Sequence, residues 1–253
     1  ADAIFYPDMS YNIDEKQGDD HFNCPVVAYY PQVIKLNVAD VKKTKFISDF
    51  ISLYDKKQFL KRIRAILGKH FPEKNFTAKQ IAEATNSAYA EYAEYLESIR
   101  TEGEKYIEKA KKTGKPVILL AGRPYHADPE INHGIHELIS RLGAIVISED
   151  SVRPHNGKLD TNVRNQWTYH ARLYNAAKFV ANAPENLDIH LVQLVSFGCG
   201  VDAVTTDEVR SIVESSGRLY AQIKIDEISN TGAVTIRLRS LMSVLELRKN
   251  KKN

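Results

Sequence analysis

The sequence predicts an α/β protein in which helices flank parallel sheets. Two observations carry this prediction. Short continuous apolar runs, such as residues 116–121, alternate with helical periodicity through the second half of the chain, and such runs are typical of parallel strands buried on both faces. A stretch rich in Ala, Glu and Lys over residues 78–112 contains no Pro and predicts one long helix between two α/β parts.

Residues 1–54 are expected to be the remainder of an N-terminal α/β lobe. Residues 4–6 resemble the end of a buried strand, and the chain opens on ADAIFYP, so we expect this lobe to be truncated upstream. Cys24-Pro25 opens a predicted helix that continues to Val38, with Pro31 as a point of interruption. Residues 46–53 form a weaker strand candidate.

Residues 55–115 are predicted to be a helical linker. Apolar residues at helical spacing predict a helix over residues 59–68 that ends at Gly68. Thr77 and Gln80 have the spacing of a capping box, which places the start of the long helix at residue 78.

Residues 116–253 are predicted to form a C-terminal α/β lobe. Its expected strands are residues 116–121, 144–148, 191–197 and 220–225. Its expected helices are residues 131–142, 167–179 and 206–216, with a last helix from residue 231. In this interpretation Asp207 and Glu208 lie in the first turn of their helix, where the helix dipole favours negative charge.

Composition narrows the classes of protein that this chain can belong to. Its 253 residues include 35 Lys and Arg against 32 Asp and Glu, a net charge of +3 that does not indicate a nucleic-acid binder. Two cysteines exclude a disulfide scaffold and a self-contained four-thiolate site. The sequence shows no membrane-spanning run and no signal peptide, so we expect a cytoplasmic protein.

Two loops follow predicted strands at the sheet edge where open α/β proteins bind ligands. The loop at residues 122–129 contains Arg123, His126 and Asp128, which combine a cation, a titratable imidazole and a carboxylate. The loop at residues 197–202 places Cys199 between two glycines, which leaves room around the sulfur for a metal, a cluster or a substrate.

Each cysteine also has a structural interpretation. Cys199 could be a small buried apolar residue, and the same holds for Cys24, although a helix N-terminus favours a thiolate. A disulfide between them is disfavoured in a reducing cytoplasm.

A metal site built from histidines is also disfavoured. His126, His133, His136 and Asp128 match no zinc template, and they more plausibly cap a helix or line a pocket. The sequence lacks the dinucleotide-binding glycine motif, the Walker loop and the serine-hydrolase elbow.

Four segments carry a resemblance to a known family. They are FNCPVVAYYPQVI at residues 22–34, GRPYHADPEINHGI at 122–135, FGCGVDAVTTDEV at 197–209, and IKIDE with RLRSL within 223–241. Together they resemble the 2-hydroxyacyl-CoA dehydratase-like portion of the CoA-substrate-specific enzyme activases, which are related to the 2-hydroxyglutaryl-CoA dehydratase activator. The resemblance implies two flavodoxin-like or Rossmann-like lobes with parallel sheets, joined by a long helical segment.

The resemblance also implies a cofactor and partners. Relatives hold a [4Fe-4S] cluster, or a double-cubane [8Fe-9S] cluster, and Cys24 and Cys199 match positions of cluster ligands. A further ligand cysteine is expected upstream, so this chain alone should be inactive and should load a cluster poorly. The expected partners are ATPase activator domains of the same parent chain, an acyl-CoA substrate and a second copy in a homodimer.

For the site, we expect His126 to be a catalytic residue, either a proton donor or a neighbour of the cluster. The residues expected to line the cleft are Arg123, Tyr125, Asp128, His133 and Gly134. Two alternatives stay open: a non-catalytic regulatory or docking module, marked by sulfurs more than about 15 Å apart, and a cluster-free α/β enzyme that uses the loop of Arg123, His126 and Asp128.

Overall fold

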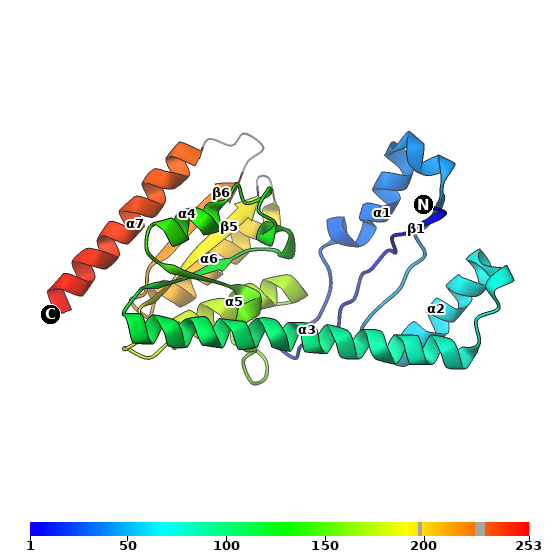
Figure 1. The fold of residues 1–253 in the computed structure, drawn as a ribbon, viewed down its shortest axis with the longest axis horizontal. Coiled ribbons are helices and arrows are strands. Elements are labelled where there is room, and N and C mark those ends of the chain that lie inside the picture. The colour runs from blue at the N-terminus through cyan, green and yellow to red at the C-terminus, as the bar shows by residue number, and fades with distance from the viewer. Residues whose placement is uncertain (197–198, 226–230, 253) are drawn as a thin grey trace. The chain divides into compact units, whose positions relative to one another are not determined.

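The computed structural model describes residues 1–196, 199–225 and 231–252, and it has the predicted α/β architecture with two parallel sheets (Figure 1). The chain divides into two compact units. Unit 1 comprises Ala1–Tyr95 and Asn165–Thr168, and unit 2 comprises Leu96–Arg164 and Tyr169–Asn253. The division falls inside the long helix α3 (Ala78–Thr113), so each unit contains part of that helix.

Unit 1 contains a small sheet in which β1 (Ala3–Phe5) pairs in parallel with β2 (Lys45–Ile47). The strand candidate over residues 46–53 is therefore shorter than predicted, and Ile51 adds only an isolated bridge to Met9. Helix α1 (Pro25–Asn37) begins directly after Cys24 and continues through Pro31. A 3-10 helix, η1 (Ala39–Lys43), follows it.

Helix α2 (Lys56–His70) begins where the Asp55 carboxylate accepts hydrogen bonds from the backbone N–H groups of Lys57 and Gln58. It continues two residues beyond Gly68, and a short 3-10 helix, η2 (Pro72–Lys74), follows. The capping box at the start of α3 is confirmed: the Thr77 N–H donates to Gln80 Oε1 at 2.9 Å, and the Gln80 N–H donates to Thr77 Oγ1 at 3.2 Å.

Unit 2 is built on a four-stranded parallel sheet with the order β4-β3-β5-β6. The strands are β3 (Val117–Ala121), β4 (Ile145–Ser148), β5 (Ile189–Ser196) and β6 (Tyr220–Ile225). Numbered within the sheet this is the order 2-1-3-4, which is the order of flavodoxin-like doubly wound proteins and has its switch point between β3 and β5.

Helices cover both faces of this sheet (Figure 1). One face packs against α3, α5 (Thr168–Ala181) and α6 (Gly200–Glu214), through residues such as Ile107, Leu173 and Val209. The other face packs against α4 (Ile135–Arg141) and α7 (Thr231–Lys252), through residues such as Ile139 and Leu238. Because both faces of β3 are buried against helices, its sequence is an unbroken apolar run.

Two helices of unit 2 begin four or more residues from their predicted positions. Helix α4 begins at Ile135 rather than 131, because His133 and Gly134 adopt left-handed backbone conformations, with φ of 52° and 69°. Helix α6 begins six residues earlier than predicted, so Asp202 occupies its first turn instead of Asp207 and Glu208. The hydroxyls of Thr205 and Thr206 donate to backbone carbonyls four residues back, which lets both residues lie inside the helix.

Residue 197 of the predicted strand 191–197 lies outside the described residues. Among the described helices, none combines the length and the apolar character that a membrane crossing requires.

Candidate functional site

A pocket of about 190 Å³ opens at the carboxyl end of the unit 2 sheet. It lies where β3 meets β4 and β5, at the switch point of the strand order, where open parallel sheets bind ligands. Its lining combines apolar side chains of the strands with polar groups that follow them: Leu120, Gly122, Arg123, His126, Ala127, Asn132, His136, Val146, Ile147, Ser148, Glu149 and Leu194.

Arg123 is the first charged residue after β3, and it pairs with a carboxylate from another element. Its Nη2 forms an ion pair with Oδ1 of Asp202 in the first turn of α6, and the two side chains are only 16% and 9% exposed. Burial opposes the charge of Arg123, but the hydrogen bond and charge of Asp202 outweigh it and raise the pKa of the guanidinium. Arg123 therefore stays a cation, and the pair ties the loop after β3 to the start of α6.

His126 lies in the 3-10 helix η3 (Pro124–Ala127), where its contacts select one tautomer. The backbone N–H of Arg123 donates to His126 Nδ1 at 3.0 Å, so Nδ1 is an acceptor. Burial and the charge of Arg123 lower the pKa of His126 to about 4, so the ring is neutral at pH 7. Its proton then resides on Nε2, which donates to Ser196 Oγ at 2.9 Å.

The hydroxyls of Tyr125 and Ser196 complete this network. Tyr125 Oη accepts from Arg123 Nη1 at 2.9 Å and lies 2.9 Å from Ser196 Oγ. Arg123 donates to Tyr125 Oη, and His126 donates to Ser196 Oγ. One of the two hydroxyl groups therefore donates its hydrogen to the other oxygen, and the second hydroxyl can donate its hydrogen to another acceptor. Tyr125 is 39% exposed, so the network can donate this hydrogen bond to a bound molecule.

Gly122 allows the loop to fold back so tightly. A Cβ atom at this position would lie 2.6 Å from His126 Nδ1 and 2.9 Å from His126 Cβ, so any side chain would displace the imidazole. On the other side of the ring, Asn132 Nδ2 donates to the His126 carbonyl at 3.0 Å, and Asn132 Oδ1 lies 3.0 Å from His136 Nδ1. The neighbouring residues therefore hold His126 in a fixed orientation.

Glu149, at the end of β4, contributes a buried carboxyl group to the pocket. Its Oε2 accepts from the Gly122 N–H at 3.3 Å. Burial, reinforced by the charge of Asp150, raises the pKa of Glu149 well above its ordinary value. A carboxyl group of this kind stays protonated closer to neutral pH and can donate a hydrogen bond, which an ordinary glutamate cannot.

The structure brings some of the predicted site residues together and not others. Arg123, Tyr125 and His126 form one hydrogen-bonded network, as described. Asp128 instead ends η3, where its Oδ1 accepts from the backbone N–H groups of Glu130 and Ile131 at 2.9 and 3.3 Å. His133 and Gly134 form the left-handed turn before α4, and neither lines the pocket.

The two cysteines belong to different units. Cys24 is the N-cap of α1 in unit 1, and Cys199 is the N-cap of α6 in unit 2. Both are free and partly exposed, and neither side chain caps its helix by a hydrogen bond. Cys199 lies close enough to Arg123 for their charges to interact. Within the described residues, no group of three or more His, Cys, Asp or Glu side chains is arranged to hold a metal ion.

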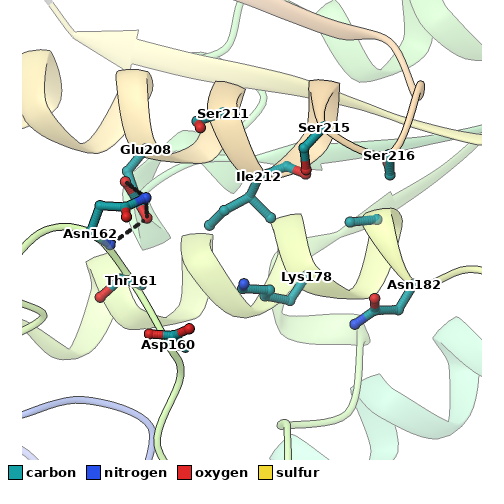
Figure 2. Close-up of a pocket in the computed structure, with 11 residues that line it drawn as sticks. Asp160, Thr161, Asn162, Lys178, Asn182, Glu208, Ser211, Ile212, Ser215 and Ser216 are labelled. Atoms are coloured by element: carbon teal, nitrogen blue, oxygen red, sulfur yellow. Dashed lines mark hydrogen bonds between the residues drawn. The ribbon is translucent and has the colours of Figure 1, made fainter.

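A second pocket, of about 310 Å³, lies between α5, α6 and the loop at residues 160–162 (Figure 2). Its buried carboxylate is Glu208, which accepts from the Asn162 backbone N–H at 2.9 Å and from Asn162 Nδ2 at 3.3 Å. The lining helix residues come from the C-terminal halves of α5 and α6, away from the carboxyl ends of the strands. Glu208 therefore anchors the loop, and the functional candidate is the pocket at the switch point.

Sequence reasoning missed Ser196, Asp202, Glu149 and Asn132 as site residues. Ser196 and Glu149 directly end β5 and β4, so a search for polar residues at every strand end would have found both. Asp202 and Asn132 gave no such signal, because their roles depend on where α6 begins and on the turns before α4.

No curated protein matches the chain. The family model described as the CoA enzyme activase uncharacterised domain matches residues 1–152, which are more than half of the sequence and include the Arg123 loop and Glu149. The chain therefore belongs to the CoA enzyme activase domain family.

Proposed function

We propose that this chain is a module of an ATP-dependent, iron–sulfur-linked electron-transfer protein, of the kind that serves 2-hydroxyacyl-CoA dehydratases or reductases. Cys24 and Cys199 are two of the thiolate ligands of its cluster, and the remaining ligands come from outside this chain. The observation that carries the proposal is the position of Cys199: a partly exposed thiol at the switch point, beside Arg123, in a chain of the CoA enzyme activase domain family.

The described residues fit part of a cluster site. Two free thiols at helix N-termini suit thiolate ligation, and with only two cysteines the chain needs further ligands. When bound, a cluster supplies one-electron transfer. The residues around Cys199 would determine the polar environment of the cluster. Arg123 keeps a fixed positive charge near the Cys199 sulfur, and the pair of Tyr125 and Ser196 donates one hydrogen bond. The Nε2–H of His126 orients Ser196.

The proposal includes partners. ATPase activator domains of the same parent chain would deliver the electron, and an acyl-CoA would be the final substrate. Membership of an activase domain family supports interaction with a partner enzyme. The switch-point pocket, at about 190 Å³, is large enough for a small acyl group but not for a whole coenzyme.

Transfer of a synthetic cluster tests the ligands. Under anaerobic conditions, the chain is mixed with a [4Fe-4S] cluster that carries four exchangeable thiolates, and bound iron is measured after gel filtration. We expect partial loading, with two synthetic thiolates retained, and loss of bound iron in Cys24→Ser and in Cys199→Ser. Ala203→Ser, at an exposed position in the first turn of α6, is the matched control, because it introduces the same serine and removes no sulfur. Iron retention that is unchanged in both cysteine variants would refute the ligand assignment.

A distance measurement separates this proposal from a docking module. Cys24 and Cys199 are the only cysteines of the chain, so spin labels attach to both without engineering. Two ligands of one cluster require a population with sulfurs closer than about 15 Å. A distance distribution that lies wholly beyond this value would favour the docking module.

A cluster-free enzyme is the second candidate, and the hydrogen-bonded loop of Arg123 and His126 beside the pocket supports it. Asp128 would not take part, since its carboxylate closes the turn after η3. This candidate predicts activity that survives Cys199→Ser and disappears in His126→Ala, whereas the electron-transfer proposal predicts loss in Cys199→Ser of the intact parent protein.

A further inference from the structure

The outer edge of β6 lies in a groove between two helices. Among the described residues, β6 pairs with β5 alone, so its other side is a sheet edge. A groove of about 440 Å³ runs along this edge, with a floor from β6 and walls from α6 and α7: Arg210, Glu214, Tyr220, Gln222, Lys224 and Arg237 are its main lining residues. The unpaired N–H and C=O groups of a sheet edge are a template for pairing with one more strand.

The backbone of β6 determines which groups face this groove. The Leu219 carbonyl accepts from the Leu191 N–H at 3.1 Å, and the Leu219 N–H donates to His190 Nδ1 at 2.8 Å, so the backbone groups of Leu219 point toward β5. In a strand these directions alternate from one residue to the next. The backbone N–H and C=O of Tyr220 and Gln222 therefore point toward the open edge.

The floor of the groove is held rigidly. The Tyr220 hydroxyl donates to Gln193 Oε1 at 3.0 Å, and the Arg210 guanidinium lies 5.3 Å from the centre of the Tyr220 ring. Arg210 Nη2 also donates to Gln222 Oε1 at 3.3 Å. An additional strand would thus meet an ordered surface, which reduces the entropy that its docking costs.

The charge of the groove indicates the chemistry of that strand. Three cations, Arg210, Lys224 and Arg237, and one carboxylate, Glu214, line the groove, and Arg210 also lies 3.6 Å from Asp207. Arg237 on α7 is exposed and brings its charge to the edge from the second wall. Edge-to-edge pairing of two copies would bring these cations against one another, which disfavours a second copy as the occupant.

We propose that the β6 edge binds an extended segment with acidic side chains on both of its faces, which adds to the sheet as a fifth strand. Its backbone pairs with Tyr220 and Gln222, and its carboxylates lie near Arg210 and Arg237. This is strand addition, in which backbone hydrogen bonds supply affinity and side-chain charges supply selectivity. The inference is independent of the cysteines and of the switch-point pocket.

Binding of a short fluorescent peptide with the repeat Glu-Glu-Val-Val, which places carboxylates on both faces of a strand, tests this proposal by anisotropy. We expect saturable binding that weakens as salt rises, no binding of the matching Lys and Val peptide, and no binding of the same Glu and Val peptide with every backbone nitrogen methylated, which cannot donate to a ladder. Arg210→Gln and Arg237→Gln should each weaken binding roughly two- to fivefold, as expected for exposed ion pairs. Equal binding of the N-methylated peptide, or displacement by inorganic phosphate alone, would overturn the proposal in favour of a simple anion site.

A backbone variant separates strand addition from charge attraction. Gln222→Pro removes the N–H that faces the edge, while the neighbouring residues keep their bonds to β5, since Pro is tolerated on edge strands. Gln222→Val is the matched control, because it removes the same side-chain amide but keeps the N–H. We expect peptide binding to survive in Gln222→Val and to be lost in Gln222→Pro, with slowed hydrogen exchange of the Tyr220 and Gln222 amides in the peptide-bound wild type. Equal binding by the two variants would contradict the proposed pairing.

Discussion

The two units differ in how completely they bury their apolar residues. In unit 2, helices cover both faces of a four-stranded sheet, and Val117, Ile118 and Leu119 of β3 are fully buried. In unit 1, a two-stranded sheet contributes to a small cluster of Ile47, Ile51 and Ile66. Helix α1 leaves most of its large apolar residues more than 45% exposed: Val26, Val27, Tyr29, Tyr30, Val33 and Leu36.

This difference teaches that similar local patterns do not yield similar packing. Apolar strands and helices occur in both units, but two strands of three residues each offer too little surface to cover a helix that is apolar on several sides. We therefore expect most of the cooperative stability to reside in unit 2. The exposed surface of α1 is of the kind that marks an interaction site.

The largest effect should come from matched leucine truncations. Leu119→Ala removes a fully buried side chain from the centre of the unit 2 sheet and should lower the free energy of unfolding by about 3–4 kcal/mol. Leu36→Ala removes a side chain that is 74% exposed in unit 1 and should change it by less than about 0.5 kcal/mol. Urea unfolding followed by circular dichroism measures both, and Trp167 fluorescence reports unit 1 because it is the only tryptophan. Equal losses in the two variants would break the comparison.

Glycine substitutions in two helices should have opposite signs. A Cβ at Gly103 of α3 would overlap the Ser151 carbonyl oxygen and lie 2.7 Å from Ser151 Cβ, so Gly103→Ala should destabilise unit 2 by about 2 kcal/mol. Gly68 of α2 has no atom within 4 Å of the same position, so Gly68→Ala should stabilise unit 1 by about 0.5–1 kcal/mol through helix propensity. Thermal unfolding of both variants checks the pair. A stabilised Gly103→Ala would show that α3 does not pack closely on unit 2.

Acid should weaken unit 2 before unit 1. Burial and the charge of Arg123 lower the pKa of both His126 and His170 to about 4. As the pH falls below 6.5, the ordinary pKa of histidine, the unfolded state therefore binds protons at these two residues before the folded state does. Each ring therefore contributes stability that is fully present above pH 6.5 and is lost as pH falls toward 4, by about 2 kcal/mol at pH 5. In unit 1, burial of Asp49 would raise its pKa, but hydrogen bonds from Lys69 and His70 outweigh burial and lower the pKa. The stability that Asp49 contributes is therefore lost only below about pH 3.8.

Hydrogen exchange at pH 7 and pH 5, read separately on peptides of each unit, measures this difference. His126→Asn is the control, because its side-chain oxygen can replace Nδ1 as the acceptor for the Arg123 N–H. The variant should lose about 2 kcal/mol less than the wild type between the two pH values. An identical pH dependence would mean that His126 is not buried in its neutral form.

Strand and helix positions of unit 2 could be predicted from the sequence because burial on both faces leaves a simple signal. The strand at residues 116–121 was predicted for this reason and is observed as β3, since a buried apolar run does not depend on distant partners. The Thr77 capping box in unit 1 was predicted correctly because it is a local hydrogen-bond motif. The start of α6 was predicted wrongly, because Thr205 and Thr206 disfavour a helix interior unless their hydroxyls bond back to it.

The candidate site could be predicted only in part, and the reason is topological. Arg123, Tyr125 and His126 are close in sequence, so their loop was identifiable. Ser196, Asp202 and Glu149 join them through the pairing of β3 with β4 and β5, which the strand pattern alone does not specify. The cluster ligands Cys24 and Cys199 stay a prediction, because they belong to different units.

A further, pH-dependent effect concerns Glu149, the buried carboxyl group of the switch-point pocket. Because its folded pKa is raised by burial and Asp150, the unfolded state releases this proton first, and stability falls as pH rises above about 4.5. Glu149→Gln keeps an oxygen for the Gly122 N–H and removes this titration, so at pH 8 the variant should be more stable than the wild type, by on the order of 1 kcal/mol. Unfolding at pH 5 and pH 8 gives the test, with the advantage of the variant present mainly at pH 8. An advantage that is equal at both values would place the effect in packing rather than in ionisation, and unit 2 would then contain no neutral acid at its pocket.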